Sequence, residues 1–354
     1  MHRHQSLEMF YRGELLLVLG LVVVVGVPGS AARPQSFARN NNPATTEDFI
    51  NRYRLNSERY RVTTDDGYRL ITYRLLTKGP AKGVVLLQHG LRQSAVEWLF
   101  LKDSLPSKLL QAGYEVWLGN SRASPENAGH TRFSNTSDSY WDFSFHEIGY
   151  YDMPALIDAA LVTSGHKKLH LIAYSEGATS SMVLLSENPK YNAKISSINL
   201  IAPAVYMGNS RYSFIAHLYP QISHLIPALL ASNPFSGSSR KQLEHYRQLI
   251  VSGRFQKYNK RFQFQNHRFR SSSDEEYNLG RVTVSPIMIH FGLRDDVVNP
   301  TDVRNLGRDL KRLLGPQRVQ MKPYETFRHT DFVSRAEASQ LVYPVIVRSI
   351  ESTQ

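Results

Sequence analysis

The sequence of 354 residues contains no cysteine. This absence excludes cysteine nucleophiles, thiolate metal sites and disulfide bonds. The folded chain therefore depends on a packed core, and its length suits one sizeable α/β domain with an inserted subdomain. The 13 histidines are scattered without the spacing of metal ligands, so we predict no metal and no cofactor.

Acidic residues are scarce relative to basic ones, with 30 Asp and Glu against 42 Lys and Arg, a formal net charge of +12. Within residues 240–270 the only acid is Glu244, whereas nine residues are basic: Arg240, Lys241, Arg247, Arg254, Lys257, Lys260, Arg261, Arg268 and Arg270. Such a run usually forms a solvated face. With its interleaved aromatics it could also make peripheral contact with lipid surfaces. No nucleic-acid-binding motif is present, so we predict no nucleic-acid partner.

Long apolar runs are missing as well. The run 15–27 is shorter than the ~20 residues that span a bilayer. Arg3 and Arg12 precede it and small residues follow it, which predicts a signal peptide over 1–32, cleaved after Ala32. The alternative is an uncleaved membrane anchor. After cleavage we expect no integral membrane span, and the sequon Asn135-Thr136-Ser137 predicts N-glycosylation at Asn135.

The apolar run 169–173 ends at Tyr174-Ser175-Glu176-Gly177, and a helix-compatible stretch follows. A strand, a serine flanked by small residues and then a helix are typical of a nucleophile elbow. The general pattern is G-x-S-x-G, and Ala173 replaces its first glycine. Alone, this pattern is a weak indication of a catalytic serine, so the interpretation depends on whether an acid and a histidine follow in a suitable order.

Two possible partners follow in the chain. Asp295 comes after the strand-like run 285–292, and His329 comes after the strand-like run 319–324. The order Ser, Asp, His is that of α/β-hydrolases, in which the histidine activates the serine and the carboxylate orients the ring. Asp296 is the alternative acid. We interpret Asp331 as a residue that holds the histidine loop.

An oxyanion hole is expected on the other side of the serine. The apolar strand 83–88 ends at His89-Gly90-Leu91. In this arrangement one backbone N–H comes from the loop after that strand and one from the residue after the nucleophile. We therefore predict Leu91 and Glu176 as the oxyanion donors. His89 and His290 are interpreted as structural.

The alternation of strand-like and helical segments predicts an α/β-hydrolase fold, a mainly parallel sheet covered by helices on both faces. A hairpin is expected over 60–73, and helices over 99–111, 148–161 and 178–186. The alternation stops between 206 and 284, which predicts an inserted, mostly helical cap. The expected segments are a signal peptide 1–32, a leader 33–55, core 56–205, cap 206–284 and core 285–354. The apolar segment 214–230 either lines a pocket or packs as a buried helix.

Together these stretches resemble the acid lipase family of gastric and lysosomal lipases, whose insect members are often secreted. The matching stretches are 61–68, 87–91, 119–122, 140–149, 151–155, the elbow, 245–248, 252–255, 291–303 and 329–332. The resemblance implies a lipase or esterase that cleaves lipid esters through Ser175, Asp295 and His329, in a secreted or endolysosomal setting. It also implies structural roles for Glu147 and Asp152.

The chain departs from the family at the elbow, where G-H-S-Q-G is usual and Ala173, Tyr174 and Glu176 stand instead. A carboxylate beside the oxyanion hole would oppose the developing negative charge, so we hypothesise greater activity at acidic pH. The altered elbow also leaves open an inactive lipase homologue that acts as a lipid-binding protein. Peptidase or thioesterase activity is a third alternative, because the triad alone does not set the substrate.

Overall fold

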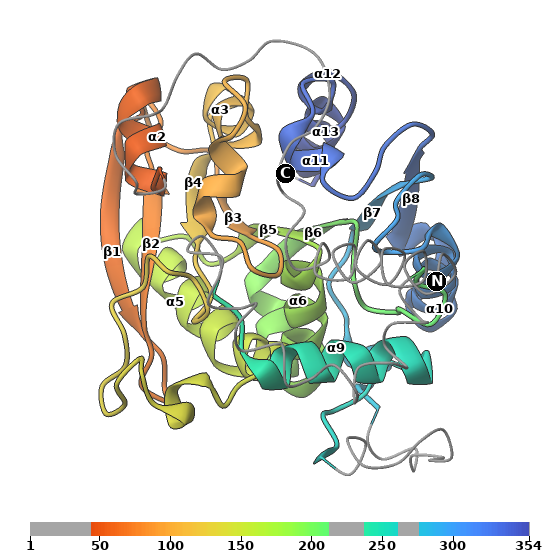
Figure 1. Ribbon diagram of the computed structural model, residues 1–354. Coiled ribbons are helices and arrows are strands. Elements are labelled where there is room, and N and C mark those ends of the chain that lie inside the picture. The colour runs from red at the N-terminus through yellow and green to blue at the C-terminus, as the bar shows by residue number, and fades with distance from the viewer. Residues whose placement is uncertain (1–43, 212–236, 261–275, 354) are drawn as a thin grey trace, which may run out of the picture.

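The strand-forming runs of the sequence build one sheet, shown in Figure 1. The structure is a computed structural model, and it describes residues 44–211, 237–260 and 276–353. The sheet has eight strands in the order β1-β2-β4-β3-β5-β6-β7-β8. Their bounds are β1 Ser57–Thr63, β2 Arg69–Leu75, β3 Val84–Gln88, β4 Glu115–Gly119, β5 Leu169–Tyr174, β6 Ile195–Ile201, β7 Ile287–Gly292 and β8 Val319–Tyr324.

The sheet is antiparallel at one edge and parallel elsewhere. Strands β1 and β2 form the predicted hairpin, with Thr63 opposite Arg69, and β2 pairs antiparallel with β4. All remaining pairs are parallel. The central strands β3, β4 and β5 are buried along their whole length, as their continuous apolar runs predict. Their carboxyl ends therefore meet at one edge of the sheet.

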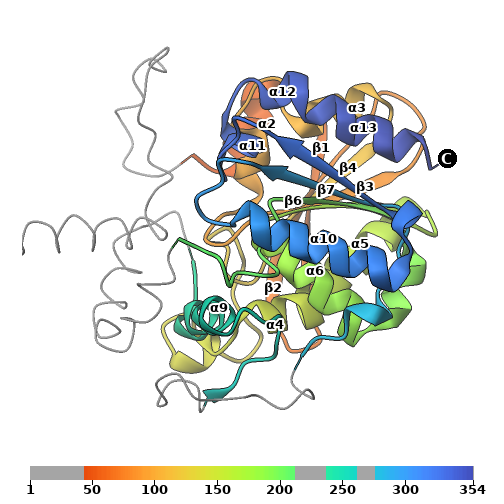
Figure 2. The same ribbon diagram turned by 90° about the vertical axis from the view of Figure 1, so that its right-hand side faces the viewer.

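Helices cover both faces of the sheet (Figure 2). One layer holds α5 Met153–Ser164, α6 Glu176–Glu187 and α10 Pro300–Leu314. The opposite layer holds α2 Thr46–Tyr53, α3 Leu105–Gln111, α11 Asp331–Ser334, α12 Ala338–Leu341 and α13 Tyr343–Glu351. Each layer encloses its own apolar cluster against the sheet. This arrangement confirms the predicted fold class.

Three helical segments differ from the sequence expectation. Helix α3 begins at Leu105, with Ser104 as its N-cap, because the residues up to Leu99 form a separate 3-10 turn. The expected helix 148–161 starts as the π-helical turn Ile148–Asp152 and becomes α-helical only at Met153. Helix α6 starts at Glu176, directly after the serine.

The described part of the predicted leader 33–55 includes helix α2, which packs on the core. Helix α2 begins with a capping box in which Thr45 and Asp48 exchange hydrogen bonds. Ile50 is 2% exposed, and the Thr46 hydroxyl donates to Glu126 at 2.7 Å. Residues 33–43 and the predicted signal peptide 1–32 lie outside the described residues.

The predicted insertion 206–284 contributes one long helix among the described residues. Helix α9 (Arg240–Ser252) starts at a capping box formed by Ser239 and Gln242. It crosses in front of α6 at the carboxyl-end side of the sheet (Figures 1 and 2). The apolar segment 214–230 lies outside the described residues. Within the described ranges, no helix is both long and apolar enough to cross a membrane.

Candidate active site

Ser175 occupies a strained turn between β5 and α6. Its φ of 52° and ψ of −112° are uncommon for a residue with a side chain. The neighbouring strand β6 fixes the backbone of this turn, since the Ser175 N–H donates to the Ile201 carbonyl at 2.9 Å. A Cβ at Gly177 would lie 2.5 Å from the Gln88 carbonyl oxygen, so only glycine allows α6 to approach β3 this closely.

Of the two predicted partners, His329 contacts Ser175 directly, and Asp295 contacts the other side of the His329 ring. His329 Nε2 lies 2.9 Å from Ser175 Oγ, and His329 Nδ1 lies 2.9 Å from Asp295 Oδ2. The three residues are 7%, 8% and 8% exposed. The imidazole can therefore accept the hydroxyl proton while its other nitrogen donates to the carboxylate.

The backbone around Asp295 fixes its second oxygen. Asp295 Oδ1 accepts hydrogen bonds from the N–H groups of Val297 and Val298 at 2.9 and 2.8 Å. The alternative acid, Asp296, instead lies 3.6 Å from the guanidinium of Arg211. The geometry thus joins His329 to Asp295.

The loop that carries the histidine is anchored at two points. The Tyr174 hydroxyl, adjacent to Ser175, donates to the His329 carbonyl at 3.1 Å. Asp331 accepts the Arg328 N–H at 2.8 Å, as expected for a residue that holds the loop. The elbow and the histidine loop are therefore linked by the side chain of Tyr174 as well as by the imidazole of His329.

The loop after β3 lies against the elbow. A Cβ at Gly90 would lie 3.3 Å from the Cβ of Ser175, and Leu91 follows directly. His89 Nδ1 contacts the Gly90 carbonyl at 2.8 Å, and His89 Nε2 accepts the Ser121 N–H at 3.0 Å. Burial lowers the pKa of His89 to about 4, which keeps the ring neutral in this structural role.

Glu97 is a site residue that sequence reasoning missed. It is 1% exposed, and its carboxyl accepts the Gly90 N–H at 2.9 Å. Burial raises its pKa well above the usual range. The sequence did carry a signal, because Ser94 and Glu97 have capping-box spacing. That pattern predicts a bond from Glu97 back to Ser94, whereas Glu97 holds the predicted oxyanion loop.

The side chain of Glu176 contacts the cap helix. Gln242 Nε2, on α9, lies 2.6 and 2.7 Å from the two carboxyl oxygens, and Glu176 is 3% exposed. Burial raises the pKa of Glu176 to about 8, although hydrogen bonds from Gln242 and Tyr246 oppose the shift. Sequence reasoning did not identify Gln242, which lies 66 residues away.

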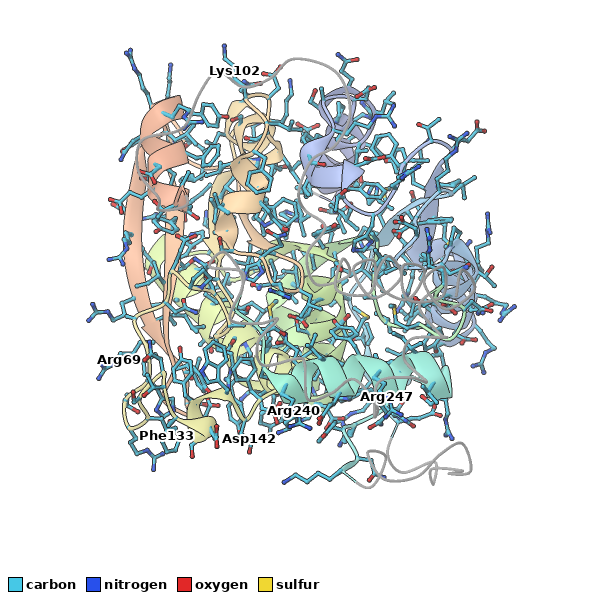
Figure 3. The ribbon with its side chains drawn as sticks, in the orientation of Figure 1. Arg69, Lys102, Phe133, Asp142, Arg240 and Arg247 are labelled. Atoms are coloured by element: carbon cyan, nitrogen blue, oxygen red, sulfur yellow. The ribbon has the colours of Figure 1, made fainter. Side chains whose placement is uncertain are left out.

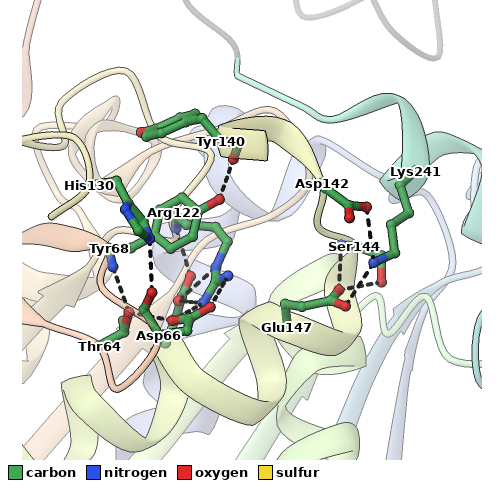
Figure 4. Close-up of polar contacts among 11 residues, drawn as sticks. Thr64, Asp66, Tyr68, Arg122, His130, Tyr140, Asp142, Ser144, Glu147 and Lys241 are labelled. Carbon is green, nitrogen blue, oxygen red and sulfur yellow. Dashed lines mark hydrogen bonds and ion pairs between the residues drawn. The ribbon is translucent and has the colours of Figure 1, made fainter. Parts of the chain in front are cut away.

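A buried ion cluster supports the segments beside the elbow (Figure 4). Arg122 is 1% exposed, and its guanidinium donates to Asp152 at 2.7 Å and to Asp66 at 2.7 Å, above the ring of Tyr68. Burial alone would lower the pKa of Arg122, but the two carboxylates outweigh it and raise the pKa. Asp152 thus has a structural role, as the family resemblance implies.

Helix α9 is also attached to the core by Lys241. Its ammonium lies 3.0 Å from Glu147 and 3.3 Å from Asp142 (Figure 4). His245, on the same helix, contacts the Ser144 hydroxyl at 3.0 Å and stacks on Phe145. These contacts fix α9 against the core.

The basic segment 240–270 is largely paired where it is described. Figure 3 labels Arg240 and Arg247 on α9, with Asp142 beside the start of the helix. Each of four basic side chains contacts an acid, in the pairs Arg240–Glu244, Lys241–Glu147, Arg254–Glu276 and Lys257–Glu187. This pairing favours a solvated face, while contact with lipid surfaces stays a prediction. Arg261, Arg268 and Arg270 lie outside the described residues.

The strand order, the parallel crossovers and the turn at Ser175 place the protein among the α/β-hydrolases. Solved structures of esterases share this fold. A carboxyl esterase from Bacillus coagulans gives a TM-score of 0.59 at 14% identity over 84% of this chain and 98% of the esterase. An aryl esterase described as putative, from Burkholderia cenocepacia, gives 0.54 at 13% identity over 84% and 99%. Within the ranges described here, no group of three or more His, Asp and Glu residues is arranged to hold a metal ion.

Sequence comparison defines the family more narrowly. The family model "Partial alpha/beta-hydrolase lipase region" matches residues 46–101, and "Serine aminopeptidase, S33" matches residues 79–333. Lipase 1 of Drosophila melanogaster is 30% identical over 86% of this chain and 79% of its own length. Mouse gastric triacylglycerol lipase is 31% identical over 82% and 87%. The chain belongs to the acid lipase family, and it is a carboxylic ester hydrolase.

Proposed function

We propose that the protein is a secreted serine lipase that cleaves fatty-acyl esters through an acyl-enzyme, with Ser175, His329 and Asp295 as its catalytic residues. The observation that carries the proposal is the pair of 2.9 Å contacts that His329 makes with Ser175 and Asp295. A serine at positive φ, aimed from the carboxyl end of a parallel strand, is the arrangement that exposes a nucleophile to an ester carbonyl.

In the proposed reaction, Ser175 Oγ attacks the ester carbonyl carbon while its proton passes to His329 Nε2. Asp295 stabilises the imidazolium, and the N–H groups of Leu91 and Glu176 stabilise the oxyanion. His329 then protonates the leaving alkoxide, so the alcohol departs and the acyl-enzyme remains. Water, deprotonated by His329, attacks this ester and releases the fatty acid.

Acylglycerols and sterol esters are the proposed substrates. The support for a lipid ester is the similarity to proteins named as triacylglycerol lipases, over most of the chain. No comparison favours the alternative of an inactive lipid-binding homologue, so we do not propose it.

Secretion or an endolysosomal location follows from the predicted signal peptide 1–32. Asn135, the predicted glycosylation site, is exposed on the loop before the 3-10 turn Asp138–Trp141. Expression in cells with a secretory pathway should give a product in the medium that begins at Arg33 and carries an N-glycan on Asn135. A product retained with residues 1–32 attached would support an anchor instead.

A fluorophosphonate probe tests the serine mechanism. The wild-type protein should be labelled at Ser175, and Ser175→Ala should lose both the label and all ester hydrolysis. Ser334→Ala, a change at an exposed serine near the histidine loop, is the control and should keep the label. Release assays with long-chain triacylglycerol, sterol ester, thioester and peptide should show acid release from the first two. Peptide cleavage without ester cleavage would contradict the proposal.

A further inference from the structure

The carboxyl group of Glu176 lies buried between the elbow and the cap. Gln242 Nε2 contacts both carboxyl oxygens of Glu176. The orientation of the Gln242 amide is fixed by two hydrogen bonds to its oxygen. Gln242 Oε1 accepts hydrogen bonds from the Ser239 N–H at 3.2 Å and from the Ser238 hydroxyl at 2.9 Å. The amide nitrogen of Gln242 therefore has to face Glu176, and it can only donate.

We propose that Glu176 is a positioning residue for ester hydrolysis, whose side chain, held by Gln242 of the cap helix, places the first turn of α6 and its oxyanion-binding N–H beside Ser175. This inference rests on the proposed serine mechanism. It assigns a function to the contact between the cap and the elbow, because the same residue supplies the backbone donor and the side-chain link. Small displacements of such a donor reduce transition-state stabilisation strongly.

The contacts suit a protonated carboxyl group. A neutral Glu176 accepts from the Gln242 amide and interacts with the hydroxyl of Tyr246, and neither partner is charged. The Tyr246 hydroxyl in turn donates to Thr179 Oγ1 at 3.2 Å. This small network then holds no charge in the buried space.

The surrounding groups do not offset a negative charge on Glu176. From α9, Gln242 and Tyr246 are uncharged donors, and burial raises the pKa of Tyr246 well above its usual range. From the π-helical turn, Asp152 adds a like charge that also raises the pKa of Glu176. Arg122, which balances Asp152, directs its guanidinium to Asp152 and Asp66.

The groups on the two other sides of Glu176 are either neutral or already paired with another residue. The loop after β3 contributes His89, whose ring is neutral because burial lowers its pKa to about 4. Across Ser175, the imidazole of His329 is directed to Asp295 and to the serine. The start of helix α6 favours an anion at Glu176, but burial outweighs it, with a resulting pKa of about 8.

Ionisation of Glu176 should therefore reduce hydrolysis. It would place a negative charge on the residue whose N–H stabilises the oxyanion, and it would leave that charge with neutral donors only. A charge several ångströms from the oxyanion, at the effective dielectric near protein surfaces, corresponds to a rate loss on the order of tenfold. The loss should appear as pH rises through about 8.

The first test compares kcat at pH 7 and pH 9 on a soluble short-chain ester. The wild-type ratio of kcat at pH 9 to pH 7 should be on the order of tenfold lower than that of Glu176→Gln, because the amide cannot ionise. Glu187→Gln makes the same chemical change at the other end of α6, and it should keep the wild-type profile. KM should change little, since the link acts on the transition state.

The second test exchanges donor and acceptor. Gln242→Glu keeps the acceptor that caps Ser239 but places two carboxyl groups together, so kcat should fall on the order of tenfold or more at neutral pH. The double variant Glu176→Gln with Gln242→Glu restores one donor and one acceptor, and it should recover most of the loss. A fold defect in the cap would not be rescued in this way.

Two results would overturn the inference while leaving the serine mechanism intact. One is a Glu176→Gln profile identical to that of wild type, in a protein that is labelled at Ser175. The other is a Gln242→Glu variant with wild-type kcat across the pH range. A wild-type protein that is not labelled at Ser175 would refute the proposed function and, with it, this inference.

Discussion

Substitution of Gly177 by alanine should displace the loop after β3, which carries the proposed oxyanion donor Leu91, from Ser175. The added Cβ would lie 2.5 Å from the Gln88 carbonyl oxygen and 2.9 Å from that of His89, whereas real Cβ atoms essentially never come within 3.0 Å. The backbone must therefore separate by at least about 0.5 Å, from 2.5 to 3.0 Å. Both contact atoms are backbone, so no side-chain rotation relieves the overlap.

Gly177→Ala should lower both the free energy of unfolding and kcat. Overpacking of this kind costs about 1–3 kcal/mol of unfolding free energy. Because the strand that is pushed back leads directly into Gly90 and Leu91, the larger effect should be on kcat, with a loss on the order of 10²-fold, as for removal of one oxyanion donor. Active sites tolerate displacements of only about 0.5 Å.

The assay is kcat on a soluble short-chain ester, together with thermal unfolding of the same preparation. Gly79→Ala is the matched control, because a Cβ at Gly79 meets nothing within 4 Å, and it should behave as wild type. A folded Gly177→Ala protein with wild-type kcat would refute the reasoning, since it would show that the close approach does not set the oxyanion geometry.

Three further predictions concern buried acids. Asp295→Asn should lower kcat on the order of 10³–10⁴-fold, while Asp296→Asn should stay near wild type in the same ester assay. The pKa of Glu176 is raised from 4.5 to about 8, so its contribution to stability is present below pH 4.5 and is lost as pH rises toward 8. Urea unfolding at several pH values should show this decline in the wild-type protein and not in Glu176→Gln. Asp152→Asn removes a carboxylate from buried Arg122, which should cost about 3–5 kcal/mol in denaturant unfolding, and an unchanged midpoint would contradict the ion-pair argument.

The strands were predictable because burial on both faces of a parallel sheet demands continuous apolar runs. The run 169–173 is of this kind, and so is the run before His89. The convergence of Ser175, Asp295 and His329 followed from the same logic, because each residue lies in the turn or loop after a strand whose carboxyl end lies at the same edge of the sheet. These local patterns are sufficient to bring the three side chains to one region.

What the sequence did not reveal depends on contacts between distant segments. The direction of the Glu176 side chain is set by Gln242, and no local pattern connects them. Glu97 has the spacing of a capping box, yet its carboxyl accepts the N–H of Gly90 in the loop after β3. Helix α2 was missed because the third helical residue of its capping box is Asp48, which is less diagnostic at that position than the usual Glu or Gln.

The pairing of β6 with β7 has a consequence for how this chain can vary. Ile198 lies opposite Ile287, so two strands separated by more than 80 residues of chain are direct neighbours in the hydrogen-bond ladder. The chain between the two strands leaves the sheet at the end of β6 and returns to it at the start of the neighbouring β7. That stretch can therefore gain, lose or exchange residues over generations while the ladder beneath it stays whole.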